Sequence, residues 1–227
     1  MLGYVIWHAQ GGIRPVVERR ILAQVLFQVW EAAPARTPWQ RRRLRQTGEL
    51  MVRSGVRQVA VERDTPPELL QRFGLEEVDC GALRLAGLKH LLTFAAAHQQ
   101  VALPGSCVAL RAAQVNARVI HAARILAGCS RRITLDVGAG QEELERLLRW
   151  EYGLVPGGTP ELQLCVSCPA QPALPALHIG RDCHRRQKIL WDYPELPQAG
   201  ESLLSAIFQA KKGKMKDIRV KSVEFSA

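Results

Sequence analysis

The chain has 227 residues, of which 47% are hydrophobic and 23% are charged, so it is long enough for one large globular core or two small ones. No apolar run approaches the ~20 residues that a membrane-spanning helix needs, and the first eight residues lack the basic and apolar regions of a signal peptide. We therefore expect no membrane segment, a cytoplasmic location, and six cysteines that are reduced thiols rather than a disulfide framework.

The net charge of +10 is concentrated near the amino terminus, because residues 1–63 carry eleven Lys or Arg and only four Asp or Glu. Such a surface admits a polyanion or a phosphorylated small molecule as partner. The simpler interpretation is a solvated basic surface, since no aromatic residues alternate with the basic ones along the chain.

The first half of the chain alternates apolar strands with helical patterns. Tyr4–His8 predicts a strand, and Pro15–Ala32 predicts a helix because apolar residues recur at every fourth position. Thr37-Pro38-Trp39-Gln40 has the pattern of a capping box, which predicts a second helix to about Ser54, before the strand Val56–Glu62. Thr65-Pro66-Pro67-Glu68 repeats the capping pattern ahead of a short helix, and the apolar segment Ala82–Ala97 predicts a buried helix.

The second half repeats this plan. The predicted strands are Val101–Leu103, Arg132–Val137, 162–167 and 218–225, with two further short strands near Ala176–Ile179 and Lys188–Trp191. The predicted helices are Val108–Ala127, Gln141–Tyr152 and Ser202–Lys212. Gln141–Tyr152 has the clearest pattern, because its leucines share one face and Gly153 provides a natural stop.

Together these elements predict an α/β protein with a Rossmann-like, doubly wound and mostly parallel sheet, and an antiparallel edge strand at the carboxyl terminus. We place a domain boundary at His98–Gln100, between a basic amino-terminal α/β lobe of residues 1–99 and a Rossmann-like lobe of residues 100–227. No internal sequence repeat of fixed period is present.

Residues 133–140, Ile-Thr-Leu-Asp-Val-Gly-Ala-Gly, resemble the first motif of S-adenosylmethionine-dependent methyltransferases. The resemblance implies a strand that ends in an acidic residue, Asp136, followed by glycines that let a ligand approach the backbone. Two features depart from that family. Only 91 residues follow Asp136, and the segment that should end in a second acidic residue is the turn Val155–Thr159.

A nucleotide-type crevice is the second interpretation of this region. If Val101–Leu103 and Arg132–Val137 are neighbouring strands, their following loops leave the same edge of the sheet. We therefore name Gly105, Ser106, Asp136, Gly138 and Gly140 as candidate ligand-binding residues, with an anion subsite at the start of a helix near Val108. A dinucleotide fingerprint has three glycines, whereas this loop has only Gly105. A ligand smaller than a dinucleotide is therefore favoured.

Cys165-Val166-Ser167-Cys168, with His178, Cys183 and His184, suggests a zinc site. In a continuous strand, however, residues three apart point to opposite faces, so Cys165 and Cys168 share a metal only if the strand ends between them. We predict buried thiols, no zinc and no disulfide. His8 and Asp64, each close to the end of a predicted strand, are minor candidates for active residues.

Three functions follow from these patterns. The first is a Rossmann-like protein that binds a small nucleotide-like or other anionic ligand through a degenerate fingerprint. The second is a methyltransferase or NAD(P)-dependent enzyme of unusual arrangement. The third is a non-catalytic interaction module that uses the basic surface around Arg41, Arg42, Arg43 and Arg45, for which we expect only weak nucleic-acid binding that disappears near physiological salt. The sequence specifies no cofactor, reaction or oligomeric state.

Overall fold

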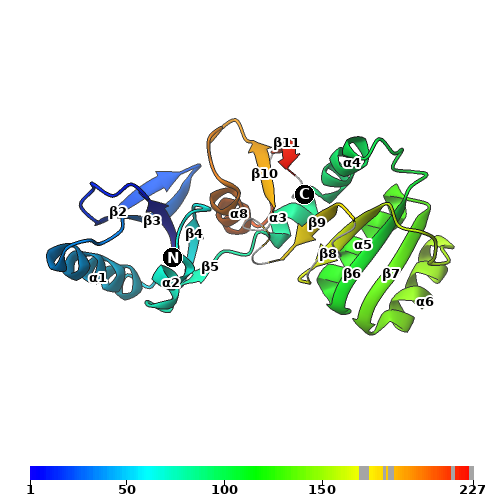
Figure 1. Ribbon diagram of the computed structural model, residues 1–227, viewed down its shortest axis with the longest axis horizontal. Coiled ribbons are helices and arrows are strands. Elements are labelled where there is room, and N and C mark those ends of the chain that lie inside the picture. Colours follow the sequence, from blue (N-terminus) through cyan, green and yellow to red (C-terminus); the bar gives the residue numbers. More distant parts are fainter. Residues whose placement is uncertain (169–173, 181–182, 184–186, 216–217, 225–227) are drawn as a thin grey trace. The chain divides into compact units, whose positions relative to one another are not determined.

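The computed structural model describes residues 1–168, 174–180, 183, 187–215 and 218–224. The chain divides into two compact units (Figure 1). The first unit comprises Met1–Cys80 and Trp191–Ile218, and the second comprises Gly81–Leu190 and Arg219–Ala227. The boundary expected at His98–Gln100 lies inside the second unit, at the end of helix α4 (Leu88–His98).

The first unit contains a five-stranded sheet with the order β2-β3-β1-β4-β5. In chain order its strands are β1 (Leu2–Trp7), β2 (Val16–Leu22), β3 (Val25–Ala32), β4 (Gln58–Val61) and β5 (Glu76–Glu77). Strand β1 is central and runs parallel to both β3 and β4, and β5 runs parallel to β4. Strand β2 is antiparallel to β3 and forms the edge.

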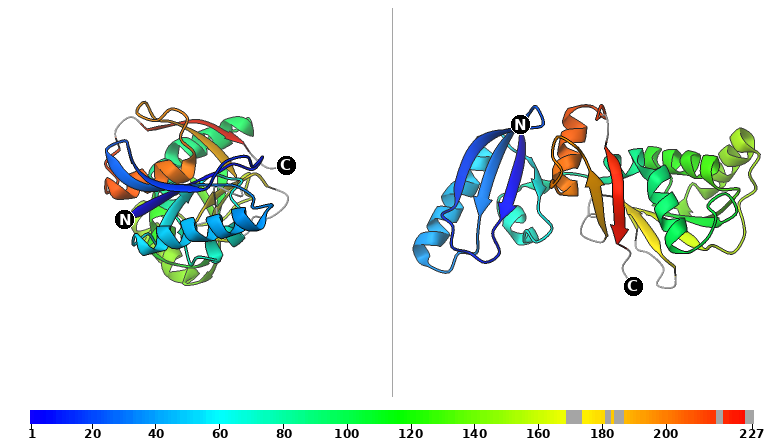
Figure 2. Two further views of the ribbon diagram at one scale, coloured as in Figure 1. Left: turned by 90° about the vertical axis from the view of Figure 1, so that its left-hand side faces the viewer. Right: turned by 90° about the horizontal axis from the view of Figure 1, so that it is seen from above.

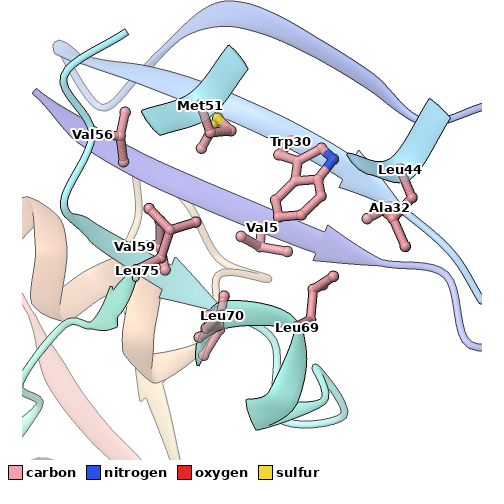
Figure 3. Close-up of a cluster of buried hydrophobic side chains, with 11 residues drawn as sticks. Val5, Trp30, Ala32, Leu44, Met51, Val56, Val59, Leu69, Leu70 and Leu75 are labelled. Atoms are coloured by element: carbon pink, nitrogen blue, oxygen red, sulfur yellow. The ribbon is translucent and has the colours of Figure 1, made fainter. Parts of the chain in front are cut away.

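Helices cover both faces of this sheet. On one face, α1 (Pro38–Arg53) and α2 (Pro67–Gln71) pack over a core centred on Trp30, whose indole N–H donates to Thr47 Oγ1 at 2.9 Å. Figure 3 shows the Trp30 side chain above Val5, with Met51 on one side and Leu44 on the other. On the other face, Leu203 and Ile207 of α8 (Glu201–Ala210) belong to a second core cluster. Two buried layers on one sheet explain why its central strands are almost continuously apolar.

The helix predicted over Pro15–Ala32 is wrong, since this segment is the hairpin β2–β3. The apolar residues used for the prediction recur every four positions, and four is also a multiple of the strand period of two. The two turn residues, Ala23 and Gln24, have left-handed φ angles of 45° and 64°, the conformation of a two-residue hairpin turn. Neither residue type signals such a turn, so the pattern favoured a continuous helix.

The second unit contains a four-stranded parallel sheet with the order β7-β6-β8-β9. In chain order its strands are β6 (Cys107–Gln114), β7 (Arg132–Ala139), β8 (Leu162–Val166) and β9 (Ala176–Ile179). Helix α5 (Ala117–Cys129) connects β6 to β7, and α6 (Gln141–Tyr152) connects β7 to β8. Two helices, α3 (Gly81–Ala86) and α4, precede the sheet where one continuous helix was expected.

The two units share one strand order. When the parallel strands of each sheet are numbered along the chain, both sheets have the order 2-1-3-4, that is β3-β1-β4-β5 and β7-β6-β8-β9. The chain leaves the first strand to one side and returns on the other, so each sheet has a topological switch point, between β1 and β4 and between β6 and β8. Ligands of open α/β sheets bind outside the carboxyl ends of the strands at such points.

The assignments of Val101–Leu103 as a strand and Val108–Ala127 as a helix are wrong. Residues 101–106 form turns, β6 occupies Cys107–Gln114, and the helix begins only after Asn116. The Asn116 side chain accepts hydrogen bonds from the backbone N–H groups of Arg118 and Val119, both at 3.0 Å, and so caps α5. Strand β6 was taken for a helix because it is rich in alanine. Asn116, a typical N-cap residue, was the signal that the helix begins only after it.

Other expectations are confirmed. The protein is α/β with mostly parallel, Rossmann-like sheets, although its parallel strands are divided between two sheets. Thr37 and Gln40 form the expected capping box, and α6 ends at Gly153. By contrast, Thr65 makes no cap for α2, and the last strand, β11 (Arg219–Glu224), pairs with β10 (Lys188–Asp192) in a separate two-stranded sheet (Figure 2). No helix in the described ranges is long and apolar enough to cross a membrane.

Candidate functional site

Four chemically active side chains occupy one level of the second sheet. Asp136 of β7 pairs with Arg111 of β6, Arg111 pairs with Cys165 of β8, and Cys165 pairs with His178 of β9. Residues in register on neighbouring strands point to the same face, so this row lies on the face opposite to Leu110, Leu135 and Leu164. A carboxylate, a guanidinium, a thiol and an imidazole therefore lie side by side across the sheet.

Arg111 and Asp136 form a close ion pair. Arg111 Nε lies 2.6 Å from Asp136 Oδ2, and this hydrogen bond raises the pKa of Arg111. The guanidinium is 20% exposed and the carboxylate 52% exposed, so the pair lies at the border between the sheet and solvent. Asp136, which the sequence predicts to bind a ligand, is thus already paired with Arg111 of the neighbouring strand.

A turn after β8 brings the Cys168 thiol back to Cys165. Strand β8 ends at Val166, and Ser167 adopts a left-handed φ of 55° while its N–H donates to Ile179 O at 2.8 Å. Cys168 Sγ then lies 3.2 Å from the carbonyl oxygen of Arg111 and hydrogen-bonds with the Cys165 thiol. The expectation that strand geometry separates the two thiols is therefore wrong, because the strand ends between them.

The surroundings of Cys168 favour its thiolate form. The hydrogen bond with Cys165 has the largest effect, burial opposes it, and the positive charge of Arg111 adds to it, so that the pKa of Cys168 is lowered to about 7. The charge of Asp136 acts in the opposite direction. Cys165 is fully buried and Cys168 is partly exposed, which gives the two thiols different access to a reaction partner.

A buried arginine binds the backbone of β9, which carries the last residue of the row, His178. Arg84 of α3 is fully buried and donates to the carbonyl oxygen of His178 at 2.9 Å and to that of Gln187 at 2.7 Å. It also donates to Gln187 Oε1 at 3.2 Å. These bonds tie β9, and with it His178, to the helix that begins the unit.

Of the residues expected to form the crevice, the structure brings only some together. Gly105 and Ser106 precede β6, where their carbonyl oxygens accept hydrogen bonds from Arg132 at 2.8 Å and Ser130 at 2.6 Å. This is the amino edge of the sheet, since Cys107 pairs with Arg132. Gly138 and Gly140 lie at the carboxyl edge, roughly 20 Å away along the strands.

The expected crevice between these two loops is therefore wrong. So is the anion subsite near Val108, which lies in a strand.

Packing accounts for both glycines at the carboxyl edge. A Cβ on Gly138 would lie 2.2 Å from Ala113 O, and Gly140 has a φ of 88°, with the Val115 side chain 3.0 Å from where a Cβ would lie. The first turn of α6 carries Glu142 and Glu143. These carboxylates complement the helix dipole themselves and repel a phosphate.

No protein-family model matches this chain, and no curated protein matches it. Among solved structures, it is similar to the crystal structure of L-tryptophan dehydrogenase from Nostoc punctiforme, at 15% identity and a TM-score of 0.33. The match covers 83% of this chain and 56% of that one, so the chain spans about half the length of the dehydrogenase.

The minor candidates lie elsewhere. His8 follows β1, and its Nε2 lies 3.8 Å from Glu31 Oε2, whereas Asp64 is exposed in the turn after β4. Within the described residues, no group of three His, Cys, Asp or Glu side chains is arranged to hold a metal ion, and His184 of the suggested zinc set lies outside them.

Arg111 and the proximity of the two thiols were not predicted from the sequence. Arg111 is the one charged residue of the apolar run 107–113, a signal that was hidden because this run was taken for the start of a helix.

Proposed function

We propose that the second unit carries out thiol–disulfide exchange through Cys165 and Cys168. The observation that carries the proposal is the left-handed turn at Ser167, which places the Cys168 thiol against Cys165 and beside Arg111. A thiol with a pKa near ambient pH is the best attacking group in such exchange, because it combines a large thiolate fraction with high nucleophilicity. In the cytoplasmic compartment that we expect, the reduced dithiol is the resting form.

The partly exposed Cys168 attacks and the buried Cys165 resolves. The Cys168 thiolate forms a bond to one sulfur of a partner disulfide RS–SR′, the S–S bond breaks, and R′S⁻ leaves and takes up a proton. Cys165 then loses its proton to solvent and attacks Cys168 Sγ, which forms the Cys165–Cys168 disulfide and releases RS⁻. The protein dithiol loses two electrons and the partner disulfide gains them.

The exchange is tested with oxidised glutathione as a low-molecular-weight disulfide. We expect wild type to end as the Cys165–Cys168 disulfide, and the Cys165→Ser variant to stop at a mixed disulfide on Cys168, both read by peptide mass spectrometry. Iodoacetamide should alkylate Cys168 with half-maximal rate near pH 7. Arg111→Met should move this midpoint up and Asp136→Asn should move it down, because their charges act on Cys168 in opposite directions.

Cys129, a partly exposed cysteine of the same unit, is the internal reference for non-specific modification. Modification of Cys129 and Cys168 at equal rates, or a Cys165→Ser variant that accumulates no mixed disulfide, would contradict the proposal.

The second candidate function is the binding of a small nucleotide-like or other anionic ligand at the carboxyl edge of the same sheet. The strand order favours it, since the β6/β8 switch point is where open α/β sheets hold ligands. Gln114 ends β6 and Asn116 follows it at this point, and Cys168 follows β8. Asp136, Gly138 and Gly140 border this edge from β7, whereas Gly105 and Ser106 lie at the other edge.

A thermal-shift panel of nucleotides, nicotinamide cofactors and S-adenosylmethionine tests this candidate. A ligand present at a hundred times its dissociation constant should stabilise the protein by ~2.7 kcal/mol. Gln114→Glu adds a negative charge at the proposed edge and should weaken binding of an anionic ligand several-fold. Arg131→Gln makes the same change of charge at the opposite edge and should leave binding unchanged. No shift with any member of the panel, or equal effects of the two substitutions, would reject this site.

A further inference from the structure

Helix α1 of the first unit carries an arginine cluster without acidic residues among it. Between Glu31 and Glu49 the chain has no Asp or Glu, and it has five arginines: Arg36, Arg41, Arg42, Arg43 and Arg45. The first turn of α1 holds no acidic residue either. Positive charges near a helix amino terminus oppose the helix dipole, so Arg41 and Arg42 do not stabilise α1 through its dipole.

Two of these five arginines, Arg43 and Arg45, have structural partners for their side chains. Arg45 Nε lies 2.8 Å from Glu49 Oε1, and Arg43 Nε donates to Pro15 O at 3.4 Å. Arg41 and Arg42 are exposed, and no acidic partner accompanies either of them in the described part of the chain. Their charge is therefore available to an anion from solution.

An exposed indole lies beside these charges. Trp39 is 57% exposed, and the Arg14 guanidinium carbon lies 5.7 Å from its ring centroid. Trp39 and Arg42 are three residues apart, so they share one face of α1, away from the buried face that includes Leu44 and Met51. Arg14 precedes β2 and is 25 positions from Trp39, which is why no alternation of basic and aromatic residues is visible along the sequence.

We propose that this surface, formed by Arg14, Trp39 and Arg42, binds single-stranded nucleic acid. The arginines neutralise phosphates, and the indole offers a stacking platform for one base. With Arg14 over the ring, Trp39 is still 57% exposed, which leaves indole surface for a base. A single strand fits better than a duplex, because the bases of a duplex are already stacked on one another and cannot lie on a side chain. The proposal is independent of the thiol chemistry of the second unit.

The test is fluorescence anisotropy of a labelled twelve-nucleotide oligo-dT over a series of salt concentrations. Trp39→Ala should weaken binding about tenfold, the usual effect of losing one stacked base. It should leave the dependence of log K on log salt unchanged, because no phosphate contact is lost. Trp39→Phe should restore most of the affinity. Arg42→Glu should weaken binding and also reduce the salt slope by about 0.7, the value for one phosphate contact on a single strand.

Arg131→Glu is the matched control, since it makes the same change of charge in the second unit and should have no effect. Circular dichroism checks that all variants are folded. If heparin and duplex DNA of equal charge bind as tightly as oligo-dT, and Trp39→Ala binds like wild type, the surface is a general polyanion surface and the proposal is wrong. Equal weakening by Arg42→Glu and Arg131→Glu would also reject it, because the binding would then follow only the net charge.

Discussion

Replacement of Arg84 by methionine is expected to lower the free energy of unfolding of the second unit by about 3 kcal/mol. The fully buried guanidinium donates to the carbonyl oxygens of His178 and Gln187 and to the Gln187 side chain. Methionine has a similar length but no donor, so buried carbonyl oxygens lose their hydrogen bonds, and each such loss costs about 1–3 kcal/mol.

Urea unfolding followed by circular dichroism measures this change. The matched control is Lys89→Met, which removes one positive charge from an exposed position of α4 and should alter the free energy of unfolding by less than about 0.5 kcal/mol. Arg84→Lys keeps the charge but cannot reach all three acceptors, and it should be intermediate. Equal stability of Arg84→Met and Lys89→Met would show that the hydrogen bonds of Arg84 do not hold β9 in place.

Alanine at Gly138 is expected to destabilise the second unit by about 2 kcal/mol or more, whereas alanine at Gly128 should stabilise it by about 0.5–1 kcal/mol. A methyl group at Gly138 would lie 2.2 Å from Ala113 O, a backbone atom of the neighbouring strand that cannot rotate away. Gly128 lies in α5 with open space where the alanine methyl group would lie, so alanine there gains helix propensity without a clash.

The Gly138→Ala and Gly128→Ala variants are compared by thermal and urea denaturation. The decisive result is a lower free energy of unfolding for the first and a higher one for the second. Equal destabilisation by both substitutions would mean that β6 and β7 are not in the register in which Gly138 passes so close to Ala113. The comparison also limits what a ligand titration can show. A bulky residue at Gly138 is expected to disturb the sheet itself, so reduced ligand binding by such a variant says nothing about direct contact.

The sequence predicted best those elements whose local signals agree. In α6, the spacing of Leu144 and Leu148, the glutamates of the first turn and the Gly153 stop all indicate the same helix. In the segment of β2 and β3 the local signals conflict. Apolar residues at every fourth position fit a helix and a strand alike, and the Ala23-Gln24 turn lacks the glycine or asparagine that is typical of a hairpin. For β6, the alanine content led to the prediction of a helix, although Asn116 is the cap of a helix that begins after it. The segment is a strand because it pairs with a neighbouring strand on each side.

The candidate site was predictable only as separate residues. Asp136 and the two cysteines were noted, but their meeting depends on the register of three strands and on one left-handed residue, Ser167. Register is a property of paired strands, so no periodicity within one segment encodes it. Asp136 was assigned to a ligand because it precedes Gly138 and Gly140, and its partner, Arg111, was not recognised because it lay in a segment taken for a helix.

The division of the first unit into two stretches of chain has a consequence for folding during synthesis. The core that contains Phe27, Val29 and Ala60 is closed by Leu203 and Ile207 of α8. This helix leaves the ribosome about 120 residues after Cys80, a delay on the order of ten seconds at ~5–20 residues per second. Meanwhile one apolar face of a sheet whose five strands have all been made stays uncovered while Gly81–Leu190, most of the second unit, is synthesised. The nascent chain is thus most prone to aggregate, and most in need of a chaperone, during the interval in which its second unit is already folding.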